Sequence, residues 1–285
     1  MTVRAIAFAF ICGTSSLPVH SLAEQTETGG STDSSESRFT REMSTDRPDL
    51  TESPYTVEKG HTQVEIEAVS HGSETSDGVE VTSTGLAGFL IKRGIHRNAD
   101  IQFGTSQLFR VTDFEFDRTL HPGEIDVSDN TGPGDLQIRL KWNFWGNDGG
   151  KTAFALMPFL DIPTSHDSPG SALEGGLIAP LAIEGPAGFG LGVMGEVDWF
   201  DVQGERWTEW LTTATASHDL VGGLGGFVEF AATFRVPDEG EWLGLFNTGA
   251  TLAITPNTQL DGGVRLGITD VAPDFEAFLG FSFRQ

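Results

Sequence analysis

The stretch Asp135-Leu-Gln-Ile-Arg-Leu-Lys-Trp-Asn-Phe-Trp145 alternates polar and apolar residues from Asp135 to Phe144. Because successive side chains of a β-strand point to opposite faces, this period of two predicts a strand with one apolar and one polar face. The following Gly146-Asn-Asp-Gly-Gly150 is typical of a tight hairpin turn, since Asn, Asp and Gly tolerate positive φ. The return segment, Thr152–Ile162, again carries apolar residues on one side. This part of the chain is therefore predicted to be a β-hairpin.

The same alternation recurs from residue 61 to residue 284, in segments of roughly ten residues separated by Gly, Pro, Asn and Asp. The predicted strands lie near residues 61–71, 79–92, 98–110, 134–145, 151–163, 175–184, 188–199, 208–217, 222–235, 242–255, 259–268 and 274–284. No apolar run reaches the roughly 20 residues that a membrane-spanning helix needs. Alternating segments of this length indicate an all-β fold, an antiparallel transmembrane β-barrel of about 12 strands over residues 61–285.

The connections between these segments alternate in length. Longer polar stretches follow the odd-numbered segments, among them residues 72–78, 112–133 and 201–207, whereas most other connections are short. Long loops at one end and short turns at the other are expected of an outer-membrane barrel. A soluble β-sandwich has no reason to sort its connections in this way.

The polar faces of the predicted strands carry many ionisable residues. The candidates to line the lumen, together with Lys92, are Glu65, Glu67, Asp100, Arg139, Lys141, Glu196, Asp198, Glu229, Asp261 and Arg265. A closed soluble core could not hold this many charges, because each unpaired buried charge is too costly. A lumen that contains water or cross-strand ion pairs can hold them. With about 12 strands, that lumen is expected to be narrow and partly occluded.

The last segment, 274–284, is expected to close the barrel by pairing with the first, since a barrel in lipid leaves no strand edge free. Its lipid face would be formed by Ala277, Leu279, Phe281 and Phe283. Its lumen face would include Glu276, Ser282 and Arg284.

The N-terminal residues have the features of an export signal. Residues 1–23 combine Arg4, a short apolar run and small residues at Ser21 and Ala23, as in a cleaved secretory signal peptide. Cleavage there would remove Cys12, the single cysteine, so no disulfide would hold the exported chain. Residues 24–43 are rich in Ser, Thr, Gly and acidic residues, which predicts a disordered acidic tail. The expected location is the bacterial outer membrane.

The overall charge excludes one class of partner. The chain has 17 Lys and Arg residues against 41 Asp and Glu residues, a formal net charge of -24. A chain this acidic repels phosphate groups, so a nucleic-acid partner is not expected. The partners expected instead are outer-membrane lipid and a small-molecule solute.

Residues 44–60 form a polar segment that leads into the barrel. Its first part, Thr45-Asp-Arg-Pro-Asp-Leu-Thr-Glu-Ser-Pro54, is too polar and too interrupted by proline to be a strand. One interpretation is a plug that enters the lumen or covers its periplasmic mouth. Its charged residues, which would then pair with charges of the wall, are Asp46, Arg47, Asp49 and Glu52. The other interpretation is a simple linker to the first strand.

Two stretches carry a resemblance to a known family. Residues 44–57 with 60–67, and residues 132–150 with 155–160, resemble the outer-membrane β-barrel "transporter" family named for a meta-pathway of phenol degradation. The resemblance implies a Gram-negative, porin-like channel for passive passage of small solutes, including aromatic or hydrophobic ones. It also implies insertion by the barrel assembly machinery. The ending Arg284-Gln285 departs from the aromatic C-terminal residue that such barrels usually have.

Two other function classes stay open. An outer-membrane lipid hydrolase would need a nucleophile and a base, and Ser70-His71 and Ser165-His-Asp-Ser168 place such groups close in sequence. Adjacent strand residues point to opposite faces, however, so we expect no catalytic residues and no enzyme. No metal-binding spacing and no cofactor motif is recognised. A structural or adhesive outer-membrane protein is the other alternative.

Overall fold

The computed structural model describes residues 39–121, 123–165, 173–202, 205–236 and 242–285. The expected signal peptide, residues 1–23, and residues 24–38 of the expected tail lie outside the described residues. Within the described ranges, no helix is long and apolar enough to cross a bilayer.

The described residues form fourteen β-strands and one short 3-10 turn, η1 (Pro186–Gly188). The strands are β1 (Thr62–Ser76), β2 (Val79–His96), β3 (Ala99–Thr105), β4 (Phe109–Phe116), β5 (Val127–Thr131), β6 (Leu136–Trp145), β7 (Thr152–Ile162), β8 (Glu174–Glu184), β9 (Gly190–Val202), β10 (Glu205–Val221), β11 (Leu224–Val236), β12 (Trp242–Thr255), β13 (Thr258–Gly267) and β14 (Phe275–Arg284).

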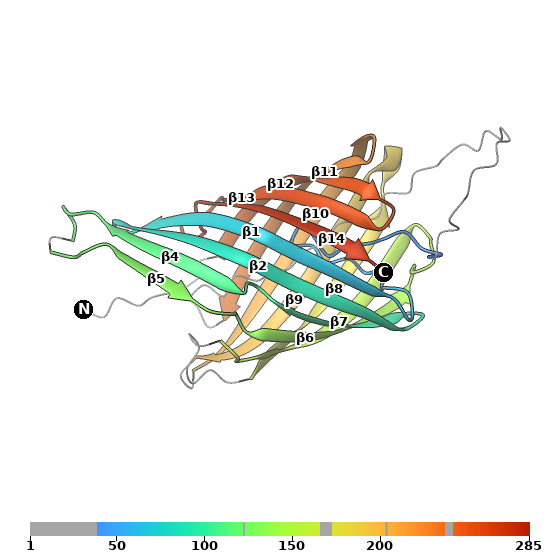
Figure 1. Ribbon diagram of the computed structural model, residues 1–285, viewed down its shortest axis with the longest axis horizontal. Coiled ribbons are helices and arrows are strands. Elements are labelled where there is room, and N and C mark those ends of the chain that lie inside the picture. Colours follow the sequence, from blue (N-terminus) through green and yellow to red (C-terminus); the bar gives the residue numbers. More distant parts are fainter. Residues whose placement is uncertain (1–38, 122, 166–172, 203–204, 237–241) are drawn as a thin grey trace.

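The fourteen strands occupy twelve positions around the barrel, because two of these positions are each shared by two shorter strands. β3 and β4 both pair with β2, one after the other, and β6 and β5 pair with β3 and β4 in the same way. Every ladder between the described strands is antiparallel. Each joins two strand positions that follow one another in the chain, except the β1–β14 ladder, which closes the sheet. The predicted all-β barrel of about 12 antiparallel strands is confirmed (Figure 1).

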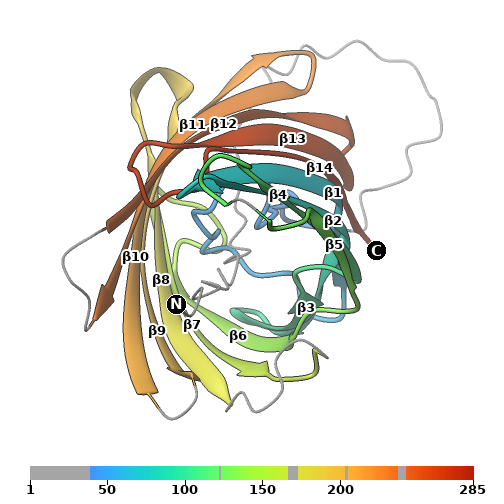
Figure 2. The same ribbon diagram turned by 90° about the vertical axis from the view of Figure 1, so that its left-hand side faces the viewer.

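The barrel closes where the last strand meets the first. β14 pairs with β1 from Gln63↔Arg284 to Ser73↔Phe275, and β1 pairs on its other side with β2. Seen along its axis, the sheet encircles a lumen (Figure 2). The faces of β14 follow the predicted alternation: Glu276 and Ser282 are buried on the inside, whereas Leu279 is exposed on the outside.

The two ends of the barrel differ. At one end, here called the short-turn end, residues 97–98, 146–151, 185–189, 222–223 and 256–257 connect the strands. In outer-membrane barrels this end faces the periplasm. At the other end β1, β2, β4 and β5 extend well beyond their neighbours (Figure 1).

Two of the predicted long loops at this second end are wrong. Residues 72–78 continue β1 to Ser76 and then turn at Asp77 and Gly78, which have φ of 50° and 76°. Residues 201–207 largely extend β9 and β10. Gly, Ser and Asp predict a loop locally, but the cross-strand ladder continues through them, as in Thr75↔Glu80 and Ser76↔Val79.

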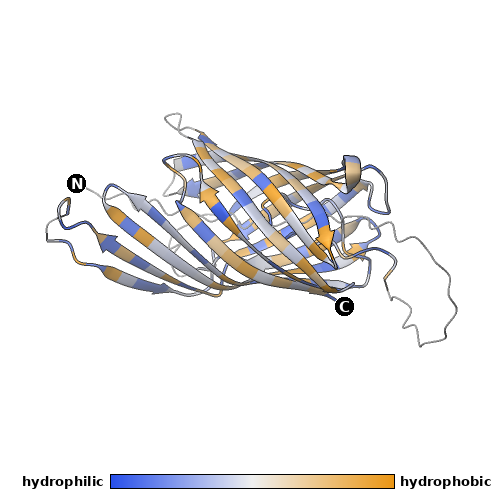
Figure 3. Cartoon of the chain, turned by 90° about the horizontal axis from the view of Figure 1, so that it is seen from above, coloured by the Kyte–Doolittle hydropathy of each residue, from blue (hydrophilic) through white to orange (hydrophobic). Residues whose placement is uncertain are grey.

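Large apolar side chains cover the outer surface of the barrel. Hydrophobic and hydrophilic residues alternate along many of the strands (Figure 3), and the outward residues include Leu140, Leu160, Phe230 and Leu279. Exposed tryptophans lie near both ends of the strands: Trp142 and Trp145 near the short-turn end, and Trp199, Trp210 and Trp242 near the other. Aromatic residues prefer the two membrane interfaces, so this surface fits a lipid-embedded barrel.

The lipid-facing surface gives a prediction about stability. Leu279 in the middle of β14 is 61% exposed, and Leu220 beside the β10–β11 turn is 62% exposed. Leu279→Arg should lower the free energy of unfolding by about 2–4 kcal/mol, whereas Leu220→Arg near the interface should change it by about 1 kcal/mol or less. Urea titration of the protein in liposomes measures both changes. Equal effects of the two substitutions would contradict the assigned membrane depth.

Candidate functional site: a segment docked in the lumen

Residues 39–60, here called the plug segment, lie inside the barrel. Both ends of the segment are at the short-turn end, where Phe39 contacts His61 and Gly60 donates a backbone hydrogen bond to Gly94. Between them the chain enters the lumen and returns (Figure 2). Residues 45–54 are buried and form no strand. Pro48 and Pro54 explain the lack of a ladder, since proline has no N–H to donate.

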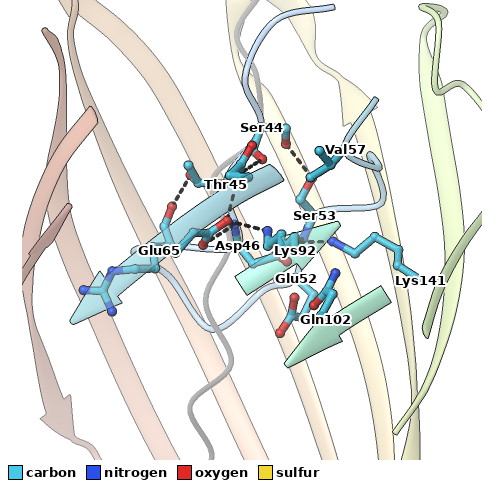
Figure 4. A network of polar contacts seen from close by, with 12 residues as sticks. Ser44, Thr45, Asp46, Glu52, Ser53, Val57, Glu65, Lys92, Gln102 and Lys141 are labelled. Atoms are coloured by element: carbon cyan, nitrogen blue, oxygen red, sulfur yellow. Dashed lines mark hydrogen bonds and ion pairs between the residues drawn. The ribbon is translucent and has the colours of Figure 1, made fainter. Parts of the chain in front are cut away.

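Asp46 is the centre of the deepest polar network (Figure 4). Its carboxylate forms ion pairs with Lys141 of β6, at 2.6 Å, and with Lys92 of β2. Its backbone N–H donates to the two carboxylate oxygens of Glu65 in β1 at 2.9 and 3.1 Å, and Lys92 also pairs with Glu65. Burial alone would raise the pKa of Asp46, but Lys141 and Lys92 hold it well below the ordinary value. Asp46 is therefore a buried anion matched by two buried cations.

Arg47 reaches in the opposite direction. Its Nη2 lies 2.9 Å from Oδ1 of Asp261 in β13, and its Nη1 lies 3.0 Å from Oε2 of Glu67 in β1. The guanidinium also lies over the ring of Phe278. A Cβ at Gly280 would lie 2.5 Å from Nη2 of Arg47, so the glycine in β14 makes room for this side chain. Arg47 thus contacts three neighbouring strands, β13, β14 and β1, at the place where the barrel closes.

Glu229 of β11 binds the backbone of the plug segment. The N–H groups of Leu50 and Thr51 donate to its two carboxylate oxygens at 2.9 and 2.7 Å. The hydroxyl of Thr51 and the amide of Asn247 donate to the same carboxylate at 2.6 Å each. Four donors converge on one carboxylate, which fixes the innermost bend of the segment.

β3, β6 and the following turn hold the returning part. Arg139 pairs with Glu52 at 2.5 Å, and the amide of Asn143 donates to the carbonyl of Pro54 at 2.9 Å. The N–H of Val57 donates to Asp100 at 2.9 Å. Backbone groups that proline and polar residues leave without a strand partner are thereby satisfied by wall side chains.

The base of the plug segment is tied to the end of β14. Arg284 donates to the carbonyls of Arg41 and Glu42 at 2.9 and 3.2 Å, and its guanidinium lies 4.1 Å from the ring centroid of Phe39. Glu58 accepts hydrogen bonds from the N–H groups of residues 40 and 41. Residues 39–43, which were expected to belong to the disordered tail, are therefore an ordered part of the plug segment.

One side of the lumen is apolar instead of charged. Leu50 packs in a buried cluster with residues of β7 to β11: Met157, Phe159, Ile178, Met194, Leu211 and Ala231. Tyr55 packs against Ala153 and Ala182. The alternation of polar and apolar residues did not predict this apolar strip. The signal available was β7, in which both alternating faces are largely apolar.

The predicted lumen-lining residues divide into two groups. Those that contact the plug segment are Glu65, Glu67, Asp100, Arg139, Lys141, Glu229 and Asp261. Arg265 pairs instead with Glu276 at 2.7 Å, and Glu196 and Asp198 lie together on β9.

Asp49 does not form the ion pair with a charged wall residue that the sequence predicted. Among the described residues it forms no ion pair, and it lies buried beside Glu229 and Thr215. Burial and the Glu229 carboxylate raise the pKa of Asp49 well above its ordinary value. A protonated Asp49 relieves the repulsion between two buried carboxyl groups.

The residues considered for hydrolysis do not converge. Ser70 lines a small polar pocket inside the barrel, together with Gln107 and Arg110. His71 is exposed on the other face of β1, with Nδ1 2.9 Å from the hydroxyl of Thr84. Residues 166–168 of the second candidate lie outside the described residues.

Comparison with known proteins identifies relatives of the whole barrel. The profile of the family described as "Putative MetA-pathway of phenol degradation" matches residues 45–285, from the plug segment to the last residue. No curated protein matches the sequence. Among solved structures, the COG4313 outer membrane channel from Pseudomonas putida F1 is similar, with 12% identity, a TM-score of 0.59, and coverage of 81% of this chain and 98% of that chain. The NanC porin has 9% identity and a TM-score of 0.49, with coverage of 77% and 98%.

The Asp46 network gives a second prediction. Asp46→Asn should lower the free energy of unfolding by about 3–5 kcal/mol, because buried Lys141 would lose its carboxylate. Asp126→Asn is the matched control: its ion pair with Arg118, at 2.8 Å, is more than half exposed, so the cost should be about 1 kcal/mol or less. Urea titration monitored by tryptophan fluorescence measures both. A loss at Asp46 no larger than that at Asp126 would show that the network does not stabilise the docked segment.

Proposed function

The chain belongs to the outer-membrane family described as "Putative MetA-pathway of phenol degradation", and from this premise we propose that it is a channel for passive passage of small solutes. The plug segment restricts this channel. The observation that supports the proposal best is the docking of residues 39–60 in the lumen through Asp46, Arg47, Leu50, Thr51 and Glu52. A purely structural or adhesive barrel would gain only stability from this segment, whereas in a channel the segment also occupies the path of the solute.

The chemistry of the lumen supports two kinds of passage. Ion pairs and hydrogen bonds hold the plug segment against β1, β2, β6 and β13, a polar side that small hydrated solutes can follow. The side formed by β7 to β11 is apolar and is now filled by Leu50. An aromatic or hydrophobic solute of modest size would be stabilised there by the same burial of apolar surface that holds Leu50. We therefore propose small aromatic or hydrophobic compounds as the specific cargo.

The proposed route into the membrane follows from the N-terminal sequence. Residues 1–23 would direct export and then be removed, and the barrel assembly machinery would insert the chain with its short-turn end toward the periplasm. The plug segment then enters the lumen from the periplasmic side. Withdrawal of the segment toward the periplasm would open the channel.

Deletion of residues 44–54 tests both the channel and its plug. The single-channel conductance in planar bilayers should rise severalfold. The deleted residues occupy the lumen and form its buried ion pairs with the wall, so their removal leaves room for ions. Arg118→Ala is the control. Arg118 lies in the connection between β4 and β5, outside the plug segment, so this substitution should leave the conductance unchanged. An unchanged open-pore current after the deletion would rule out the plug. Absence of any current in both the intact and the deleted protein would rule out the channel.

A further inference from the structure

A row of three inward positions crosses the strands where the barrel closes. Gly280 of β14 pairs with Glu67 of β1 on one side and with Asp261 of β13 on the other. Neighbouring strands are about 4.8 Å apart, so the two carboxylates flank a position that has no side chain. A Cβ at Gly280 would lie 2.5 Å from Nη2 and 2.6 Å from Nε of Arg47. The space at the glycine is therefore where the guanidinium lies.

The contacts in this row match the shape of a guanidinium group. Oδ1 of Asp261 accepts from Nε at 3.1 Å and from Nη2 at 2.9 Å, whereas Glu67 accepts from Nη1 at 3.0 Å. The guanidinium carbon also lies 5.6 Å from the ring centroid of Phe278. An ammonium group is a point charge without the planar fork that two carboxylates can share. The row is therefore better suited to a guanidinium than to a simple ammonium ion.

The wall residues of this site are buried and depend on Arg47 for their hydrogen bonds. Asp261 is 5% exposed, Glu67 8% and Phe278 3%. In the described part of the chain, Arg47 is the only hydrogen-bond donor to either carboxylate. Arg265, another cation of this wall, forms its ion pair with Glu276 at 2.7 Å. Without a guanidinium in the row, two carboxylates of the lumen would lose their hydrogen-bonded partner.

The occupant of the site belongs to the part of the chain that is proposed to move. Arg47 lies in the plug segment, whereas all its partners in the row belong to wall strands. Withdrawal of the segment would leave the whole site in the lumen without its guanidinium. A small polar cavity borders the site on the side away from the short-turn end, and its lining includes Glu67, Ser70, Gln107 and Glu276. The site therefore adjoins polar surroundings at the end of the lumen opposite the entry of the plug segment.

We propose that Glu67, Asp261 and Phe278, with the space at Gly280, form a binding site for guanidinium compounds, which Arg47 occupies as a tethered ligand. This inference rests on the proposed channel function, in which withdrawal of the plug segment opens the lumen. A free guanidinium compound that takes the site keeps Arg47 out and favours the open channel. One guanidinium replaces another, so the charge of the wall stays balanced. The compound acts as an opening ligand and not as the apolar cargo.

The tether sets the concentration at which a free compound competes. A group held by a short flexible segment has an effective concentration in the millimolar range. A free guanidinium compound has to reach a similar concentration before it displaces Arg47. Removal of the Arg47 side chain would leave the site open to a free guanidinium without this competition.

Ethylguanidinium tests the site, because it matches the part of the side chain that Arg47→Ala removes. In planar bilayers Arg47→Ala should raise the open probability of the channel, since the plug segment loses its contacts with Asp261 and Glu67. Millimolar ethylguanidinium should fill the vacated space and restore the native open probability. Ethylammonium, which has the charge without the fork, and ethylurea, which has the shape without the charge, should not. Adding Asp261→Asn to Arg47→Ala should raise the concentration of ethylguanidinium needed by about tenfold or more.

The native channel should respond in the opposite direction. Ethylguanidinium should raise its open probability, because the space at Gly280 cannot hold a second guanidinium beside that of Arg47. Arg284→Ala is the matched control, since Arg284 also binds the plug segment but donates to the carbonyls of Arg41 and Glu42 and not to carboxylates. Ethylguanidinium should not restore the native open probability of this variant.

The outcomes separate the site from its role in opening. No effect of ethylguanidinium on the native protein or on Arg47→Ala would overturn the site. Restoration of Arg47→Ala without a response of the native protein would support the site and overturn its role in opening. An equal effect of ethylammonium, or an equal effect on Arg284→Ala, would overturn the recognition of guanidinium.

Thermal unfolding provides a readout that does not depend on channel current. Ethylguanidinium bound in the site should raise the unfolding midpoint of Arg47→Ala, but not that of Arg47→Ala with Asp261→Asn. A raised midpoint in a protein that never conducts, with or without residues 44–54, would support the site and overturn the proposed channel. An unchanged midpoint in a protein that conducts would overturn the site alone. If Arg47→Ala does not fold, the response of the native channel to ethylguanidinium and ethylammonium decides.

Discussion

The arrangement of the lumen depends on the ion pairs between Asp46 and the two buried lysines, Lys92 and Lys141. Lysines facing the interior of a narrow barrel are costly unless they are paired. The plug segment supplies the missing carboxylate, and through Arg47 it supplies a cation to Asp261 and Glu67 on the opposite wall. The wall and the plug segment therefore neutralise each other. Without the segment, the charges of the wall would need water in the lumen to replace these partners.

This mutual dependence divides the lumen into two sides. The charged side fixes the position of the plug segment, because ion pairs and hydrogen bonds are directional. The apolar side, where Leu50 contacts residues of β7 to β11, is not directional and can accept another molecule of similar size. A segment held firmly on one side and by packing alone on the other can expose the apolar strip by a small displacement. The sequence Asp46-Arg-Pro-Asp-Leu50 combines both requirements within five residues.

Much of this fold follows from the sequence, because lipid outside and polar groups inside impose a period of two on every strand. That constraint predicted the strand number, the antiparallel order and the faces of β14. The period of two gave no information where the lumen is as apolar as the lipid. β7 is apolar on both faces, so the apolar strip of the lumen could not be recognised from alternation. The length of the β1–β2 hairpin also depends on cross-strand pairing, which local Gly and Ser content does not reveal. The hydrogen-bond partners of the plug segment lie up to 243 residues away in the chain, and no local pattern specifies them.

Arg284 and Gln285 have a structural role in this chain. Gln285 exchanges two backbone hydrogen bonds with Thr62 at 2.9 Å, and Arg284 binds the carbonyls of Arg41 and Glu42. Arg284 can reach these carbonyls only when β14 lies beside β1. Arg47 likewise needs Asp261 and Glu67 on opposite sides of β14. Docking of the plug segment therefore requires a closed barrel, so a partly assembled sheet cannot hold the segment in its final position. The same contacts allow the docked segment to stabilise the pairing of β14 with β1, which closes the barrel.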